Sequence, residues 1–426
     1  MKRTILCLAV LIASTHLSAQ TPARSVVLAS IAAMGGEAAL KAVRTVKVDA
    51  MGHIHALEQS ERSEGPHLLT YQQTSEIRDH EHHRLWRKEE QRNWSLPNWM
   101  GPTMVAADDV VALSFNGRWG PHQPQQLARV REDLALSPER LLLTALAAAD
   151  LRAAPDRTLH GIANHAVAFT FAGVKRTLYL NPHTSMPTML QSIEDDTFGI
   201  WGDVTRERWY TFWTLQPGGW QYPQQITTTW NGLPYSDQTV FTIKVNEPPD
   251  EALFAIPDDA KAAFRKMLAS SPAGAMGLRS ANVDPAKAIE VTPDIIILPG
   301  SWNVTLVRQP DGIVVLEAPI GSHYSVQVIE AAAGRFPGVP IKAVVTTSDA
   351  WPHLGGVREY VARGIPVYAL DLNLPILQRL VGANQSTMPD ALQLKPRQAG
   401  FRAVSERTTI GTCHAGRGDP GERRRQ

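Results

Sequence analysis

The chain has 426 residues, of which 43% are hydrophobic and 19% charged, an ordinary globular composition that allows two or three domains of roughly 100–200 residues each. The formal net charge of +1 provides no strong overall field, so charge alone favours neither nucleic acid nor an acidic membrane surface as a partner. Any partner must therefore be inferred from local features.

The N-terminal segment predicts export. A basic start, MKR, precedes an apolar run over residues 5–13, and the small residues Ser18 and Ala19 follow it. This pattern is typical of a secretory signal peptide over residues 1–19, and the run is too short to span a bilayer, which takes about 20 residues. We expect a periplasmic or secreted protein without a transmembrane span. In the mature chain Cys413 is then the sole cysteine, which excludes an intramolecular disulfide.

Residues 21–258 predict a β-rich domain, an open half-barrel. Between about residues 160 and 247, short β-branched and aromatic runs alternate with turn sequences such as NPHTS, PGG and NG, which predicts an antiparallel meander. The stretch DVTRERWYTFW indicates a sheet with two unlike faces. Val204, Arg206 and Arg208 lie on one face, and Thr205, Glu207 and Trp209 lie on the other.

Tryptophans are concentrated in this meander. An aromatic concave face buries enough apolar area to hold an acyl chain or another lipid-like ligand, although core packing is the interpretation we prefer. The meander resembles the open half-barrels of periplasmic lipoprotein carriers, and that resemblance implies binding of a lipid or a polypeptide. The tryptophans concerned are Trp201, Trp209, Trp213, Trp220 and Trp230.

Two histidine groups lie in the same domain. Alternate residues of a strand share a face, so His80 with His82, or His53 with His55, would provide an adventitious metal site. His83 stands beside the first pair. No carboxylate or third imidazole completes either pair at a justified spacing, so solvated strand faces are the preferred interpretation.

The second half of the chain changes character. Residues 259–289 follow a proline-rich segment and predict a linker, and residues 290–410 alternate strands with helices, which predicts an α/β layer. Residues 411–426 lack apolar periodicity and predict a disordered tail. The abrupt change near Gly411 favours the hypothesis of a shifted reading frame and a domain cut short.

One motif in this layer carries a resemblance. The segment TTSDAWPHLGG, residues 346–356, lies between the strand IKAVV and the helix-like VREYVARG, and NVTLVRQPDGIVVLEAP precedes it. Residues 290–372 thereby resemble the first half of a metallo-β-lactamase-fold domain. The resemblance implies an αββα sandwich, a T-H-x-H-x-D-H-x-G-G motif holding one or two zinc ions, and hydrolysis by metal-bound water. The predicted fold class is α+β and α/β, an antiparallel β-rich domain followed by the first half of that sandwich.

The metal motif is degenerate. Aligned on its two glycines, it keeps His353 as one ligand, whereas Ser348, Ala350 and Pro352 fall where the other ligands belong. A zinc site needs at least three protein ligands, so the ordinary two-zinc arrangement is excluded. In an unusual metal site, one ion would be bound by His353, Asp349 and Glu317. Glu317 would come from the end of the neighbouring strand.

The preferred alternative is a structural turn capped by Asp349, in which the two glycines permit close approach of helix and strand. The residues of this turn are Ser348, Trp351, Pro352, Gly355 and Gly356. Three functions follow: a hydrolase-like protein with little or no zinc activity, a periplasmic module binding a small molecule, lipid or polypeptide, or a product without function. The resemblance implies zinc, but the surviving residues favour a chain without it, and nucleic acid is not an expected partner.

Overall fold

A computed structural model describes residues 23–57, 65–195, 201–270 and 281–411. The chain divides into two compact units: unit 1 comprises residues 1–194 and 204–275, and unit 2 comprises residues 195–203 and 276–426. The predicted signal peptide and the residues from 412 onward lie outside the described residues, so the signal peptide and the tail stay predictions.

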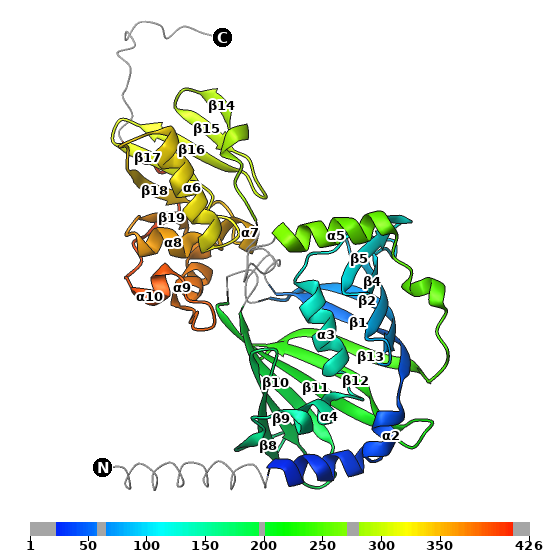
Figure 1. Cartoon of the computed structure of the whole chain (residues 1–426). Helices are drawn as coiled ribbons and strands as arrows, with labels where there is room; N and C mark the ends of the chain where they lie inside the picture. Colours follow the sequence, from blue (N-terminus) through cyan, green and yellow to red (C-terminus); the bar gives the residue numbers. More distant parts are fainter. Residues whose placement is uncertain (1–22, 58–64, 196–200, 271–280, 412–426) are drawn as a thin grey trace, which may run out of the picture. The chain divides into compact units, whose positions relative to one another are not determined.

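Unit 1 is built on one antiparallel sheet of thirteen strands (Figure 1). The strands are β1 (Thr45–Ala56), β2 (Leu68–Asp79), β3 (Arg84–Arg92), β4 (Thr103–Ala107), β5 (Val110–Phe115), β6 (Arg118–Pro121), β7 (Arg152–Leu159), β8 (Ile162–Phe171), β9 (Val174–Leu180), β10 (Pro187–Asp195), β11 (Asp203–Leu215), β12 (Gln221–Trp230) and β13 (Leu233–Val245). Their order is β6-β5-β4-β3-β2-β1-β13-β12-β11-β10-β9-β8-β7, so two meanders join where β1 pairs with β13.

Local turn chemistry explains the meanders. Five of the hairpins turn on two residues that both have positive φ, the conformation of a type I′ turn, whose twist matches that of the paired strands. Glycine or asparagine, which tolerate positive φ, occupy most of these positions. The turn pairs are Asp108–Asp109, Asn116–Gly117, His160–Gly161, Ala172–Gly173 and Asn231–Gly232.

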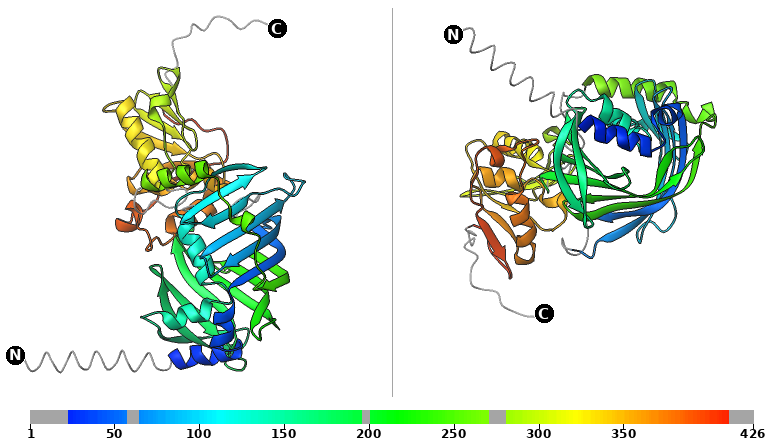
Figure 2. Two further views of the ribbon diagram at one scale, coloured as in Figure 1. Left: turned by 45° about the vertical axis from the view of Figure 1, so that its right-hand side comes forward. Right: turned by 90° about the horizontal axis from the view of Figure 1, so that it is seen from below.

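Helices lie on the concave side of the curved sheet, as Figures 1 and 2 show. They are a helix over residues 23–33, α2 (Glu37–Ala42), α3 (Gln126–Ala135), α4 (Leu141–Ala147) and α5 (Asp258–Ser270). A short 3-10 turn, η1 (Glu251–Phe254), packs Phe254 into the core that includes residues of β4 and β5. The first helix and α4 share one core with Phe169 and Trp220 of the sheet. Residues 259–270 of the predicted linker belong to α5, whose Phe264 is fully buried against the β4–β5 hairpin.

Unit 2 contains one mixed sheet of seven strands. These are β14 (Ile289–Thr292), β15 (Ile295–Leu298), β16 (Val304–Gln309), β17 (Gly312–Leu316), β18 (Ile341–Val345), β19 (Val367–Leu370) and β20 (Phe401–Val404), in sequential order. The pairs from β14 to β17 are antiparallel, and those from β17 to β20 are parallel. Its helices are α6 (Ser322–Arg335), α7 (Trp351–Leu354), α8 (Val357–Ala362), α9 (Leu374–Gly382) and α10 (Ala391–Leu394), with 3-10 turns η3 (Pro285–Lys287) and η4 (Asp371–Asn373).

The predicted fold class is wrong. The chain is mainly β, dominated by the thirteen-stranded antiparallel sheet, and unit 2 has a single sheet instead of half of an αββα sandwich. The reason is that every strand of unit 2 extends the same hydrogen-bonded ladder from β14 to β20. After β19 the chain forms helices, because Pro375 stands in the first turn of α9 and Ile376, Leu377 and Leu380 bury one helical face.

Within the described part of the chain, no helix is both long and apolar enough to cross a membrane.

The core of unit 1 can be tested with a matched pair of phenylalanines. Phe169 is 0% exposed, whereas Phe241 on β13 is 64% exposed. Phe169→Ala leaves a cavity and is expected to lower the free energy of unfolding by about 3–5 kcal/mol. Phe241→Ala is expected to change it by less than about 0.5 kcal/mol. Denaturant titration measures both, and equal losses would contradict the assignment of the core.

Candidate functional site

A cavity of about 540 Å³ lies between α3 and the concave face of the sheet in unit 1. We call it the arginine cavity. Apolar side chains from β1, β12 and β13 form part of its wall, among them Val48, Ala50, Ile54, Ile226 and Val240. Its charged lining consists of five arginines and three acids: Arg78, Arg87, Arg129, Arg206 and Arg208, with Glu76, Glu89 and Asp133.

Strand geometry explains which side chains enter the cavity. Alternate residues of β11 face the same side, so Arg206, Arg208 and Tyr210 all line it. Glu207 faces the other way and binds Arg157, with Nη1 and Oε1 2.7 Å apart. On β12, Trp230 lies directly opposite Arg206 in the register. The two unlike faces predicted for this strand are thus present, and the arginine face is the inner one.

Helix α3 closes the cavity from the opposite side. Gln126, Arg129 and Asp133 line the cavity from one face of the helix, at spacings of three and four residues. Val130 and Leu134 lie on another face and pack into the core with β4 and β5. The helix therefore presents polar groups to the concave sheet and apolar groups to its edge.

A buried ion-pair network anchors the helical segment to the sheet. Glu139, between α3 and α4, is 0% exposed and accepts hydrogen bonds from Arg78 Nε at 2.8 Å. The His80 ring lies with its Nε2 2.9 Å from the same carboxylate oxygen. Burial by itself would raise the pKa of Glu139, but the charge of Arg78 and the contact with His80 lower that pKa well below its ordinary value.

The network continues along the cavity wall. Arg78 also donates to Glu76 and, at 2.9 Å, to the Tyr222 hydroxyl. Arg87 donates to Glu76 and, from Nη2 at 2.9 Å, to Asp133 of α3. Although burial raises the pKa of Asp133, the neighbouring charges, that of Arg87 foremost, lower it overall. These side chains satisfy one another's hydrogen bonds, so they stabilise the fold and are not free to bind a ligand.

The polar groups at the β11 side of the cavity are different. Three buried donors of β11 and β12 that line it have no hydrogen-bond partner among the described residues: Arg206 Nε, Tyr210 OH and Trp230 Nε1. A fourth such donor, Thr74 Oγ1, lies on β2 directly opposite Ala50 of β1. Arg208 forms no ion pair in the described part of the chain. Burial by itself would lower its pKa, but Tyr210 and the more distant charges of Asp133, Glu132 and Glu194 raise that pKa overall. The Tyr210 hydroxyl is close to Arg208 but lacks hydrogen-bond geometry toward it. Buried donors without acceptors cost free energy, so this wall favours an acceptor-rich guest.

The electrostatics of this wall agree with that conclusion. Burial, together with the charges of Arg208 and Arg129, lowers the pKa of Arg206 to about 10. Glu194, 3.6 Å from Arg206 Nη1, opposes this shift without cancelling it. Glu194 is itself shared, because it also accepts a hydrogen bond from Arg176 at 2.8 Å. Arg206 is therefore incompletely neutralised by the protein, whereas Arg208 feels several acids without forming an ion pair with any of them in the described structure.

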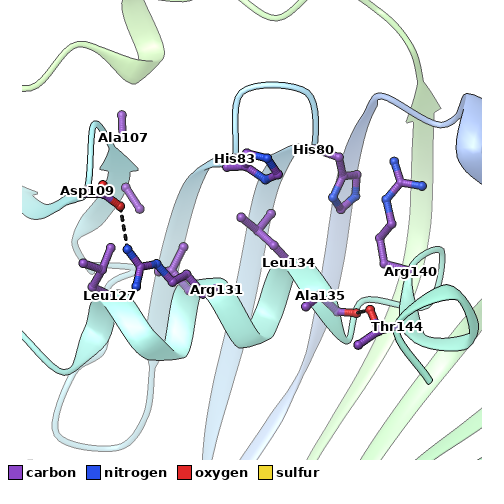
Figure 3. A pocket seen from close by; sticks show the side chains of 12 residues that line it. His80, His83, Ala107, Asp109, Leu127, Arg131, Leu134, Ala135, Arg140 and Thr144 are labelled. Carbon is purple, nitrogen blue, oxygen red and sulfur yellow. Dashed lines mark hydrogen bonds and ion pairs between the residues drawn. The ribbon is translucent and has the colours of Figure 1, made fainter. Parts of the chain in front are cut away.

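A second cavity, of about 450 Å³, lies on another side of α3 (Figure 3). We call it the histidine cavity, because His80 and His83 of the β2–β3 turn line it. Its other polar groups are already engaged: Arg131 pairs with Asp109 at 2.7 Å, and Thr144 donates to the carbonyl of Ala135 at 2.7 Å. Arg140 donates to the backbone carbonyls of residues 40 and 43. A ligand in this cavity would therefore have fewer unsatisfied polar groups to bind.

The structure separates the predicted histidine groups. His80, His82 and His83 lie in the turn between β2 and β3, not on a strand, and His82 Nδ1 lies 2.9 Å from Asp79. His53 and His55 do share a face of β1, with Asp237 of β13 3.1 and 3.8 Å away. Even so, the described residues contain no group of three histidines, cysteines or acids arranged to hold a metal ion.

The tryptophans do not form one aromatic face. Trp213 and Trp220 pack in the main core, and Trp209 stacks on His160 in a small cluster. Trp230 lines the arginine cavity, stacked on Tyr235 with ring centroids 4.1 Å apart. Trp201 precedes β11 and belongs to unit 2. Core packing accounts for most of them, and one of the five contributes to a cavity.

In unit 2, Glu317 and His353 meet beyond the end of β17. His353 Nδ1 lies 3.3 Å from Glu317 Oε2, and Thr347 donates a hydrogen bond to the other carboxylate oxygen. Glu317 has a φ of +78°, a strained conformation for a residue with a side chain. No ion pair or hydrogen bond links Asp349 to these two residues in the described structure. Of the three predicted metal ligands, the structure thus brings two together, Glu317 and His353.

The turn itself is built differently from the prediction. Ser348, not Asp349, caps it, because its Oγ accepts a hydrogen bond from the Ala350 amide at 3.0 Å. A Cβ on Gly356 would lie 2.2 Å from Ser325 Oγ, so close packing requires this glycine. Pro352 lies in α7 and Gly355 between α7 and α8, whereas the side chain of Trp351 lies outside the described part of the structure.

These residues do not make a zinc site. Glu317 and His353 supply two ligands, and a zinc site needs three or more from the protein. Across the described residues no third histidine, cysteine or acid joins them. The residues present therefore do not fit the metal that the metallo-β-lactamase resemblance implies, and no reaction step follows from it.

Sequence reasoning missed Glu139, Arg78 and Tyr210. A buried acid and arginine 61 residues apart carry no local motif, so their pairing had no signal in the sequence. For β11 the signal was present, since Arg206, Arg208 and Tyr210 stand at alternate positions of a strand.

The chain matches no family model and no curated protein. Among solved structures, a putative outer membrane lipoprotein-sorting protein domain from Vibrio parahaemolyticus aligns with 49% of this chain and 88% of its own, at 9% identity and a TM-score of 0.30. LprF from Mycobacterium bovis aligns with 55% of this chain and 96% of its own, at 10% identity and a TM-score of 0.23.

The inverting sec-alkylsulfatase Pisa1 from Pseudomonas sp. aligns at 23% identity and a TM-score of 0.19, over 21% of this chain and 15% of that enzyme. This chain therefore spans a small part of the alkylsulfatase. Likenesses at these TM-scores do not establish a function, so the function is inferred from the cavities.

The buried network predicts a pH-dependent loss of stability. Glu139→Gln removes one partner of a buried pair and is expected to lower the free energy of unfolding by about 3–5 kcal/mol near pH 7. Because the folded-state pKa of Glu139 is depressed, its contribution is present above the unfolded value of about 4.3 and is lost as pH falls below it. The gap between wild type and variant should therefore shrink in acid.

Glu251→Gln provides the control, since Glu251 also binds an arginine, Arg84, but its side chain is 70% exposed. Its loss should be much smaller and measurable in the same denaturant titrations at pH 7 and pH 3. Equal losses for the two variants would show that burial of Glu139 does not matter.

The zinc test gives a second prediction. Plasma mass spectrometry of the purified chain is expected to find zinc well below one per molecule, with a melting temperature that chelator leaves unchanged, because two ligands hold zinc weakly. One zinc per chain, lost in His353→Ala together with a chelator-sensitive melt, would contradict the poor fit.

Proposed function

We propose that unit 1 is an exported binding module that encloses a small amphiphilic molecule in the arginine cavity. Export is inferred from the predicted signal peptide, which lies outside the described residues. The observation that carries the proposal is a cavity whose sheet wall combines apolar side chains with buried donors that lack a hydrogen-bond partner among the described residues.

The size of the cavity suits such a ligand. Its volume of about 540 Å³ lies within the range of about 300–1,000 Å³ that is usual for small-molecule sites. Val48, Ala50, Ile54 and Val240 supply apolar area from two adjacent strands. The polar lining argues against a purely hydrocarbon ligand, because an alkyl chain would leave the donors of β11 unsatisfied.

Binding explains the site better than catalysis does. The cavity holds arginines, three tyrosines and a tryptophan. Of its acids, Glu76 and Asp133 bind Arg87, and Glu89 accepts a hydrogen bond from Gln91. In unit 2 the pair Glu317 and His353 lacks the ligands that hydrolysis by metal-bound water requires. Ligand binding by unit 1 is therefore the function that the geometry supports best.

A neutral probe tests the proposal. N-phenyl-1-naphthylamine fluoresces strongly in apolar surroundings and is expected to bind the full chain at one molecule per chain. Ile54→Trp narrows the cavity from β1 and should weaken that binding at least about tenfold, since it removes the space for the rings.

Met51→Trp is the matched control, because Met51 lies on the same strand but is 43% exposed and does not line the cavity. It should bind the probe as wild type does. Equal binding by wild type and Ile54→Trp, with both folded by circular dichroism, would place the probe elsewhere and refute the proposed site.

A further inference from the structure

We propose that the ligand of the arginine cavity is an amphiphilic acid whose oxyanion head group is bound by Arg208, Arg206 and Tyr210 of β11. This inference rests on the proposed function and names the chemical class of its ligand. A carboxylate, a phosphate monoester and a sulfonate share the required chemistry, namely several acceptor oxygens and a negative charge.

The donor chemistry carries the first step. Arginine Nε and indole Nε1 can only donate, so Arg206 and Trp230 cannot be satisfied by one another. The Tyr210 hydroxyl, in a residue only 2% exposed, lacks a partner in the described structure and faces the same cavity. Oxygens of one oxyanion accept several such bonds at once, and hydrogen bonds to a charged group are the strong ones.

The arrangement of charge carries the second step. Each of the other arginines of the cavity wall is paired: Arg78 with Glu139, Arg87 with Asp133, and Arg129 with Glu132 at 3.4 Å. Arg208 has no such ion pair within the described residues and lies between Arg206 and Tyr210 on the strand. A planar guanidinium that the protein leaves unpaired is suited to bind an oxyanion through two parallel hydrogen bonds.

The apolar residues that line the same cavity decide between a free anion and an amphiphile. Ala50 and Val240 face each other in the pairing of β1 with β13, and both line the cavity. A free inorganic anion would leave this apolar surface in contact with water. An acid with a hydrocarbon or aromatic part satisfies the donors of β11 and covers the apolar wall together.

Two dyes that differ by one sulfonate test the proposal. The neutral probe N-phenyl-1-naphthylamine and the acid 8-anilinonaphthalene-1-sulfonate share their rings. We expect the acid to bind wild type at least about tenfold more tightly, because charge-assisted hydrogen bonds add to the shared apolar contacts. Equal affinities would overturn the inference while leaving the proposed function intact, whereas failure of both dyes would refute the proposed function itself.

A pair of Tyr→Phe variants locates the head group. Tyr210→Phe removes an unpartnered hydroxyl, so the melting temperature should hold or rise while the preference for the acid falls several-fold. Tyr222→Phe removes a hydroxyl that accepts a hydrogen bond from Arg78, so the melting temperature should fall while the preference persists. The reverse pattern would show that the Tyr210 hydroxyl has no part in binding.

Arg208→Gln and competition complete the test. Arg208→Gln should abolish the preference for the acid and leave affinity for the neutral probe unchanged. Decanoate should displace the sulfonated dye at concentrations where inorganic phosphate does not. Displacement by phosphate, with decanoate ineffective, would overturn the amphiphilic acid in favour of a free anion.

Discussion

The buried ion pair between Arg78 and Glu139 determines how the helices of unit 1 meet its sheet. The two residues come from β2 and from the segment between α3 and α4, and a buried charge is costly unless it is paired. Their pairing holds α3 across the concave face. Because α3 then presents Arg129 and Asp133 to the sheet, the space between them becomes a cavity lined with charge instead of a packed apolar core.

Some arginines of that cavity are paired with acids and stabilise the fold, whereas others are available to bind a ligand. Around Glu76 and Glu139 the arginines are matched by acids, so the network is closed and rigid. On β11, Arg208 lacks an ion pair and the Tyr210 hydroxyl lacks a hydrogen-bond partner among the described residues. Both residues line the cavity. Such a wall is destabilising unless a ligand or water occupies it, and functional sites commonly retain this kind of cost.

Unit 2 brings part of the predicted motif together without a metal site among the described residues. Glu317 and Thr347 stand at the carboxyl ends of two parallel strands, where open α/β sheets usually bind ligands, and Glu317 keeps a strained backbone. His353 approaches from α7, but the described residues bring no third metal ligand to the pair. Gly356 packs closely against Ser325, so this glycine of the two-glycine pattern has a structural role that requires no metal.

The sequence by itself determined the features that depend on near neighbours. Hairpin turns such as Asn231–Gly232 and the alternation of Arg206 and Arg208 with Trp209 follow from backbone geometry over a few residues. It did not determine that β1 would pair with β13, that unit 2 would form one sheet, or that Glu139 would meet Arg78. Those contacts join segments tens to hundreds of residues apart, and their energies depend on burial that exists only in the folded chain. Tertiary structure alone therefore decided which face of β11 became the inner wall and which of its charges found a partner.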